Sequence, residues 1–253
     1  MDALVEVIRR DLSQSHFWLE IAQALTKAKR HDEALHWAEQ GSHAFPGHPD
    51  SALDDFLVAE YHRRKRHDDA VALRWTRYTQ QLTLHAYQDL AAAASIAKTW
   101  PQWRAKALAA LERPIAPQAR PRLGAFWSGS SKATLIEIHL WEGDVRAALK
   151  QARATSCTPH LWLDIARRLE AESPEDAIAV YRAQVDPIVQ GTNTDAYDRA
   201  VDIARRVREL MKAAGRSSDL EAWTADLRAR HKAKRNLMKR LDRLMAERSS
   251  LRK

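Results

Sequence analysis

The chain has 253 residues, of which 45% are hydrophobic, 41 are Lys or Arg and 33 are Asp or Glu. This length is enough for one large domain or two moderate ones, each with a substantial core. Only 7 residues are glycine, and Ala, Leu and Arg dominate, which favours helices over sheets. The single cysteine, Cys157, excludes an internal disulfide and any multi-cysteine zinc site, and it is typical of a reducing compartment.

The formal net charge of +8 is concentrated at the C-terminal end of the sequence. Residues 226–253 hold eleven Lys and Arg but three Asp and Glu, whereas residues 1–225 hold thirty of each. The first part is therefore formally neutral, and the isoelectric point of about 9.7 is a property of the terminal segment. Any function that depends on positive charge belongs to that segment.

Neither a targeting signal nor a membrane span is evident. Residues 1–12 carry acids and arginines within an apolar pattern, unlike a signal peptide. The longest Ala-rich apolar stretch, residues 90–97, is too short to cross a bilayer. We therefore expect a soluble, cytoplasmic protein that does not contact a membrane.

Apolar residues recur with helical spacing from near the start of the chain, and strand-like alternation is absent. Apolar sets at residues 17–25 and 34–38 predict the first two helices. A third helix begins with Asp50 or Ser51 as its N-cap, and a fourth contains residues 71–78. Most of the nine tryptophans fall inside predicted helices, and we expect them to pack in the core, including Trp18, Trp37, Trp75, Trp141 and Trp162.

One segment, residues 113–131, interrupts the helical pattern. Its three prolines remove backbone donors and its glycines disfavour helix. A loop of this length is typical of a linker or a functional segment. We therefore predict an N-terminal helical lobe at residues 1–112, a linker at 113–131, and a C-terminal helical lobe at 132–253 that ends in a basic helix.

Internal repeats indicate how the helices are organised. Residues 29–35 (KRHDEAL) and 65–71 (KRHDDAV) lie 36 positions apart, and residues 16–22 (HFWLEIA) resemble residues 160–166 (HLWLDIA). Repeated helix–turn–helix pairs are typical of α-solenoids, because each pair buries its apolar face against the next. We predict an all-α, tetratricopeptide-like superhelix of antiparallel helix pairs, with further helix–helix joints at residues 99–104, 141–148, 173–176 and 215–221.

The duplicated His-Asp pairs also suggest a metal-dependent phosphohydrolase. Such a site needs several His and Asp ligands at one point, whereas each pair here begins the second helix of a repeat, where acids favour the helix dipole. His31 and His36, and likewise His62 and His67, are five apart, which on one helix separates them by about 140°. We therefore predict no metal site.

No catalytic motif stands out. The nucleotide-binding glycine loops, the GxSxG elbow and the HExxH zinc motif are all missing. Cys157 precedes a helix predicted to begin near Thr158 and Pro159, and a helix N-terminus can activate a thiol, but a lone cysteine in a turn is more often inert. We predict that the chain is not an enzyme and has no cofactor.

The basic C-terminal segment is the best functional candidate. Leu237, Leu241 and Leu244 fall on one face of a predicted helix. This helix either caps the array with its basic face in water, or it contacts nucleic-acid phosphates or an acidic partner without reading base sequence. The candidate contacts are Arg228, Arg230, Lys232, Lys234, Arg235, Lys239, Arg240 and Arg243.

Several segments together resemble a known family. They are HDEAL followed by WAEQG, YHRRKRHDDA, WPQWRAKAL, IHLWEGDVRAAL, PEDAIAVYR and RHKAKRNLMKRLD. This combination is similar to the helical-repeat region that follows the zinc finger in bacterial SWIM zinc-finger proteins, over about residues 15 to 245. The resemblance implies a scaffold with no catalytic role. The family's CxC and CxH zinc motif cannot be formed with one cysteine, so the chain is expected to be a fragment or a relative without the finger.

These observations predict a non-catalytic helical-repeat scaffold that binds a partner protein. The alternative is an accessory nucleic-acid-binding module that uses the basic C-terminal helix.

Overall fold

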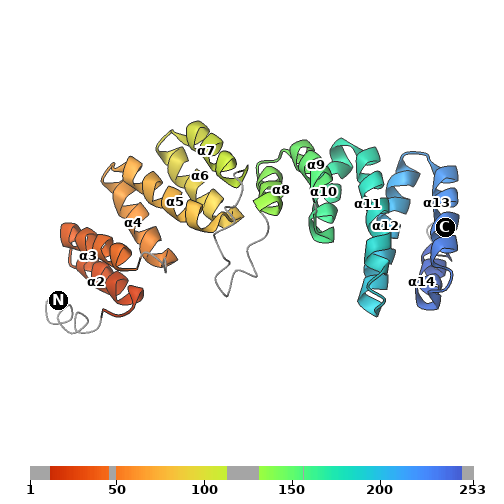
Figure 1. Cartoon of the computed structure of the whole chain (residues 1–253), viewed down its shortest axis with the longest axis horizontal. Coiled ribbons are helices and arrows are strands. Elements are labelled where there is room, and N and C mark those ends of the chain that lie inside the picture. The colour runs from red at the N-terminus through yellow and green to blue at the C-terminus, as the bar shows by residue number, and fades with distance from the viewer. Residues whose placement is uncertain (1–11, 46–49, 113–130, 156, 247–253) are drawn as a thin grey trace, which may run out of the picture. The chain divides into compact units, whose positions relative to one another are not determined.

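The structure is a computed structural model of the chain, and it describes residues 12–45, 50–112, 131–155 and 157–246. Within these ranges the chain forms thirteen α-helices and no β-strand, which confirms the predicted all-α class (Figure 1). The predicted linker, except for Ser131, lies outside the described residues. No described helix is both long and apolar enough to cross a membrane.

The contacts divide the chain into two units, residues 1–134 and 135–253, and the division falls inside helix α8 (Ser131–Trp141). The first unit contains α2 (Ser15–Lys27), α3 (His31–Ala44), α4 (Ser51–Arg63), α5 (His67–Gln81), α6 (Leu84–Ile96) and α7 (Trp100–Glu112). The second contains α9 (Val145–Ala154), α10 (Pro159–Glu172), α11 (Pro174–Val189), α12 (Thr194–Ala213), α13 (Ser217–His231) and α14 (Arg235–Ala246).

In the first unit each helix packs against the next one along the chain, from α2 to α7, and α2 also contacts α4. Small residues allow this close packing: Ala22, Ala34, Ala38 and Ala70 are completely buried between neighbouring helices. Larger apolar side chains surround them, and each stabilises the fold by roughly 1.5–3 kcal/mol when fully buried. The core formed by α2 to α5 includes Ile21, Leu25, Leu35, Leu53 and Leu57.

The second unit follows the same order, with contacts between successive helices from α9 to α14 and a further contact between α12 and α14. Its α10 matches α2, as the repeated sequences HFWLEIA and HLWLDIA predict. Ile21 and Ala22 are buried on α2, and Ile165 and Ala166 occupy the corresponding buried positions on α10. The repeat in sequence therefore reflects a repeated packing position.

The two KRHD segments form joints between helices. In the first joint Lys29 has φ of 61°, and the backbone N–H groups of Lys29 and Arg30 donate to the carbonyls of Thr26 and Leu25. This pair of bonds is the Schellman motif, which ends a helix with one residue in the left-handed conformation. Lys65 repeats it with φ of 62°, while glycines occupy the left-handed position at two later joints, Gly143 and Gly215.

The arginine of each KRHD segment is the N-cap of the following helix, although its side chain does not cap backbone N–H groups. Instead, the Arg30 guanidinium forms two 2.6 Å hydrogen bonds with the Glu33 carboxylate. Nε of Arg66 donates one hydrogen bond to the Asp69 carboxylate, also at 2.6 Å. The lysine and arginine of each KRHD segment therefore stand where one helix ends and the next begins.

The N-cap residues of α4 and α11 differ in how their side chains are used. Asp50 caps α4, and its carboxylate accepts hydrogen bonds from the backbone N–H groups of Ala52 and Leu53, as predicted. Ser173, in the predicted joint at residues 173–176, is the N-cap of α11, but its hydroxyl donates to the Asp176 carboxylate at 2.8 Å rather than capping the backbone.

The tryptophans are less buried than the sequence suggests. Trp223 is 3% exposed, but Trp141 is 45% exposed, so the expectation that Trp141 packs in the core was wrong. It is the last residue of α8, at the end of the helix rather than between packed turns. Trp18 instead packs against Gly41 of α3 and lies 5.5 Å from the ring of Trp37.

Candidate functional site

The histidines of the second KRHD segment lie closer together than the sequence analysis assumed. His62 is on α4 and His67 is the first residue of α5, so the joint folds back between them. Their Nδ1 atoms are 2.8 Å apart and their ring centroids 5.1 Å apart. The assumption that both sit on one helix was therefore wrong for this pair, whereas His31 and His36 do share α3.

A 2.8 Å contact between two imidazole nitrogens requires one to donate and the other to accept, so at most one can carry a proton at that atom. Burial lowers the pKa of His62, and the charges of His67 and Arg74 lower it further. The Nε2 atom of His62 is also buried without a hydrogen-bond partner among the described residues. Across those residues, no group of three or more His, Cys, Asp or Glu side chains is arranged to hold a metal ion.

A buried ion pair joins α4 to α5. Arg77 donates from Nε and Nη2 to the two carboxylate oxygens of Asp54, at 2.6 and 3.0 Å. The side chains of Arg77 and Asp54 are 11% and 4% exposed, and Nη2 of Arg77 also donates to the Ser42 hydroxyl. The sequence analysis did not identify this pair. Asp54 and Arg77 are 23 positions apart, and only the packing of α4 on α5 brings them together.

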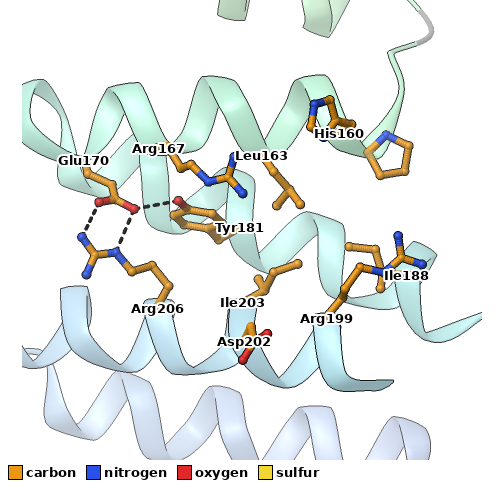
Figure 2. A pocket seen from close by; sticks show the side chains of 11 residues that line it. His160, Leu163, Arg167, Glu170, Tyr181, Ile188, Arg199, Asp202, Ile203 and Arg206 are labelled. Atoms are coloured by element: carbon orange, nitrogen blue, oxygen red, sulfur yellow. Dashed lines mark hydrogen bonds and ion pairs between the residues drawn. The ribbon is translucent and has the colours of Figure 1, made fainter. Parts of the chain in front are cut away.

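A groove in the second unit lies on α10, α11 and α12 and has a volume of about 580 Å³ (Figure 2). This volume is within the range of ligand sites. Leu163, Ile188 and Ile203 form its apolar surface, and Leu163 and Ile203 face each other from α10 and α12 in Figure 2.

A hydrogen-bonded network closes one end of the groove. The Glu170 carboxylate accepts a 2.6 Å hydrogen bond from the Tyr181 hydroxyl and a 2.8 Å bond from Nε of Arg206 (Figure 2). The Arg206 hydrogen bond lowers the pKa of Glu170, while burial and the bond to Glu170 raise the pKa of Tyr181. These groups are thus held as carboxylate and neutral phenol, states unsuited to general acid–base chemistry near pH 7.

The rim of the groove carries more positive than negative charge. Its charged residues are Arg167, Arg199, Arg206, Glu170 and Asp202. Arg167 bonds an acid outside the groove, whereas Nε of Arg199 donates only to the backbone carbonyl of Asp195, at 3.4 Å. Because Arg199 is exposed at the end opposite the Glu170 network, it is the cation best placed to meet a ligand (Figure 2).

The eight basic residues that the sequence singled out divide into two groups. Arg230 forms ion pairs with Asp186 of α11 and, at 2.9 Å, with Asp226. Arg240 of α14 donates at 2.5 Å to Asp198 of α12. These arginines hold α13 and α14 to the preceding helices.

Two more of the eight are also engaged within the chain. Arg228 bonds the carboxylate of Asp242, which joins α13 to α14. The Lys234 ammonium donates to the backbone carbonyl of Val189 at 3.3 Å and lies 5.8 Å from the ring centroid of Tyr197.

The remaining four, Lys232, Arg235, Lys239 and Arg243, are all exposed. None of them forms an ion pair or side-chain hydrogen bond with another described residue. Charge alone could not separate these four from the other four, because the groups that engage the latter lie on four helices, from α11 to α14.

Cys157 is not activated by its position. Helix α10 begins at Pro159 with Thr158 as its N-cap, as predicted. Burial nevertheless raises the pKa of the Cys157 thiol, which disfavours the nucleophilic thiolate.

No protein-family model matches the sequence, and no curated protein matches it either. The resemblance to the repeat region of SWIM zinc-finger proteins therefore stays a prediction.

Proposed function

We propose that the chain is a non-catalytic, tetratricopeptide-like scaffold that binds a segment of a partner protein in the groove on α10, α11 and α12. The groove carries this proposal, since it combines an apolar surface of suitable volume with a positively charged rim. Helical-repeat proteins bind their partners on surfaces formed by equivalent helices of successive repeats. Here α10 and α12 are such helices, because each is the first of a pair whose second helix, α11 or α13, follows a short joint.

The occupant that fits this groove is an acidic peptide segment with one apolar side chain. The apolar side chain would lie between Leu163 and Ile203, where it removes apolar surface from water. A carboxylate near it would meet Arg199 at the open end. The opposite end offers no vacant donor, because Arg206 and Tyr181 already bond Glu170.

The absence of catalysis is part of the same proposal. Acyl or phosphoryl transfer needs a nucleophile or base whose pKa is tuned toward neutrality. In this groove the pKa of Glu170 is lowered and that of Tyr181 is raised, so both move away from neutrality.

Selection of displayed random peptides on the full chain tests the proposal. We expect selected peptides to share an apolar residue near Asp or Glu. Leu163→Glu places a charge on the apolar surface and should reduce their affinity at least tenfold. The matched control is Ala179→Glu, which adds the same charge at an exposed position of α11 outside the groove.

Arg199→Glu provides a second variant, because Arg199 is exposed and its substitution leaves the apolar packing intact. Arg199→Glu should lower the affinity of the chain for the acidic peptides. Both Leu163→Glu and Arg199→Glu should keep the helical circular dichroism of the parent chain. Equal peptide binding by the parent, Leu163→Glu and Arg199→Glu would refute the groove as the binding site.

A further inference from the structure

The last helix has a fixed orientation in the second unit. Leu237, Leu241 and Leu244 of α14 are each 1% exposed, and α14 contacts both α12 and α13. These leucines lie on one face, since positions four and three residues apart are neighbours on a helix. Burial of this face determines which residues of α14 face the solvent.

The solvent face carries a line of cations. Arg235, Lys239 and Arg243 are exposed and spaced by four residues, which places them along the helix at steps of about 6 Å with a rotation of about 40° per step. At about 100° per residue, this line is nearly opposite the buried leucines. Lys232, in the turn between α13 and α14, is a further exposed cation. We call these four residues the basic stripe.

The basic stripe differs from the other cations of the same segment because none of its four side chains forms an ion pair or a hydrogen bond with another described residue. Arg228, Arg230 and Arg240 each bond an aspartate, and Lys234 bonds a backbone carbonyl. The charge of the stripe is therefore available to an external anion, whereas the charge of the other four is used in packing the helices.

The chemistry around the stripe favours a polyanion over a protein surface. Protein interfaces depend on buried apolar or aromatic anchors, and single-stranded nucleic acids on aromatic stacking platforms. Among the described residues the large exposed hydrophobic side chains are Ile96 and Trp141, neither of which is on α12, α13 or α14. The phosphate backbone of a duplex needs only regularly placed cations, and it presents one charge per about 3.4 Å of each strand.

We propose that Lys232, Arg235, Lys239 and Arg243 form a surface that binds the phosphate backbone of duplex nucleic acid without reading its sequence. This function does not depend on the groove, which uses α10 to α12. Helix α14 supplies three of the four cations at fixed spacing, and the ion pairs Arg228–Asp242 and Arg240–Asp198 hold this helix to α13 and α12. Binding releases counterions from the duplex, so the affinity falls steeply as salt increases.

Fluorescence anisotropy of the full chain with labelled DNA and RNA duplexes of two unrelated sequences tests this assignment. The key variant is the triple substitution Arg235→Gln, Lys239→Gln and Arg243→Gln. Each phosphate contact contributes about 0.9 to the slope of log affinity against log salt, so the triple variant should lose about 2.7 of this slope. At about 0.1 M salt, each lost contact should reduce the affinity about eightfold.

The matched control is Lys27→Gln, Lys132→Gln and Lys150→Gln, which removes the same charge from exposed positions elsewhere. It should bind within about twofold of the parent chain, and both variants should keep the parent melting temperature. Equal losses in both variants would overturn the proposal, because the effect would then follow net charge alone. Tighter binding to single strands than to duplexes would overturn the duplex assignment in favour of a single strand. Equal competition by poly-glutamate would overturn it in favour of an acidic protein.

Discussion

Removing the Asp54 carboxylate should be one of the most destabilising single changes in the first unit. Asp54 and Arg77 are 4% and 11% exposed, so Asp54→Ala leaves a guanidinium almost without water and without its counter-ion. Breaking a buried pair in this way costs about 3–5 kcal/mol. Arg77 keeps hydrogen bonds to Ser42 and Gln80, at 3.1 and 3.4 Å, which places the expected loss near the lower end.

Urea unfolding of the full chain, followed by far-UV circular dichroism, measures this loss as a lower midpoint for the first unit. For a unit of this size, about 3 kcal/mol corresponds to a fall of roughly 10 °C in melting temperature. The neighbouring Asp55→Ala is the matched control. Asp55 is 67% exposed, and its partner Arg74 keeps a second ion pair with Asp89 at 3.6 Å, so the loss of Asp55 should cost no more than about 1 kcal/mol.

The double variant Asp54→Leu with Arg77→Met separates the two physical effects. It removes both charges and fills similar volume, so it should be clearly less destabilising than Asp54→Ala alone. A loss in the free energy of unfolding that is no larger for Asp54→Ala than for Asp55→Ala would contradict a buried, unpaired Arg77. A double variant as unstable as Asp54→Ala would contradict it as well.

Three further predictions concern the helix joints and contacts of the first unit. Gly41→Ala should lower the free energy of unfolding by about 1–2 kcal/mol, because the added Cβ would lie 2.6 Å from Cβ of Trp18. This clash outweighs the better helix propensity of alanine. An unchanged urea midpoint would contradict the prediction. Lys65→Gly should raise the free energy of unfolding by about 0.5–1 kcal/mol, because Lys65 has φ of 62°, a conformation that glycine adopts without strain. Lys27→Gly, in the last turn of α2, should lower the free energy of unfolding. A change of the same sign in both variants would be inconsistent with the Schellman geometry. The pKa of His62 is lowered from 6.5 in the folded state, so the unfolded chain takes up the proton first, and stability should fall as the pH drops below 6.5 toward the folded pKa. His62→Thr, which introduces the residue found at the equivalent position 26, should remove this part of the pH dependence of stability. Melting temperatures measured between pH 7.5 and 5 test this. The same dependence of melting temperature on pH in the variant and the parent chain would contradict the prediction.

The helices themselves follow from local sequence. Apolar periodicity predicted the first four helices. The sequence also predicted that α4 begins at Asp50 or Ser51, that α10 begins near Thr158 and Pro159, and that residues 173–176 form a joint. Capping and helix termination involve residues within five positions of one another, so the sequence contains all the groups that take part. The KRHD segments could be assigned to joints for the same reason.

Contacts between helices depend on groups that are far apart in the chain, and the sequence did not determine them. The assumption about His62 and His67 failed because the joint brings two helices together, and the Asp54–Arg77 pair was missed because its members lie on different helices. The groove exists only once α10, α11 and α12 pack together.

The basic C-terminal segment shows most clearly what depends on sequence alone and what depends on tertiary structure. Its composition and its leucine face determined that α14 is an amphipathic, positively charged helix. Which cations remain available was decided by the tertiary structure, because Asp186 and Asp198, more than 40 positions away, bond Arg230 and Arg240 while no described acid bonds Arg235, Lys239 or Arg243. Charge is a property of the residue, but its neutralisation depends on which distant residue the packing brings within hydrogen-bond distance.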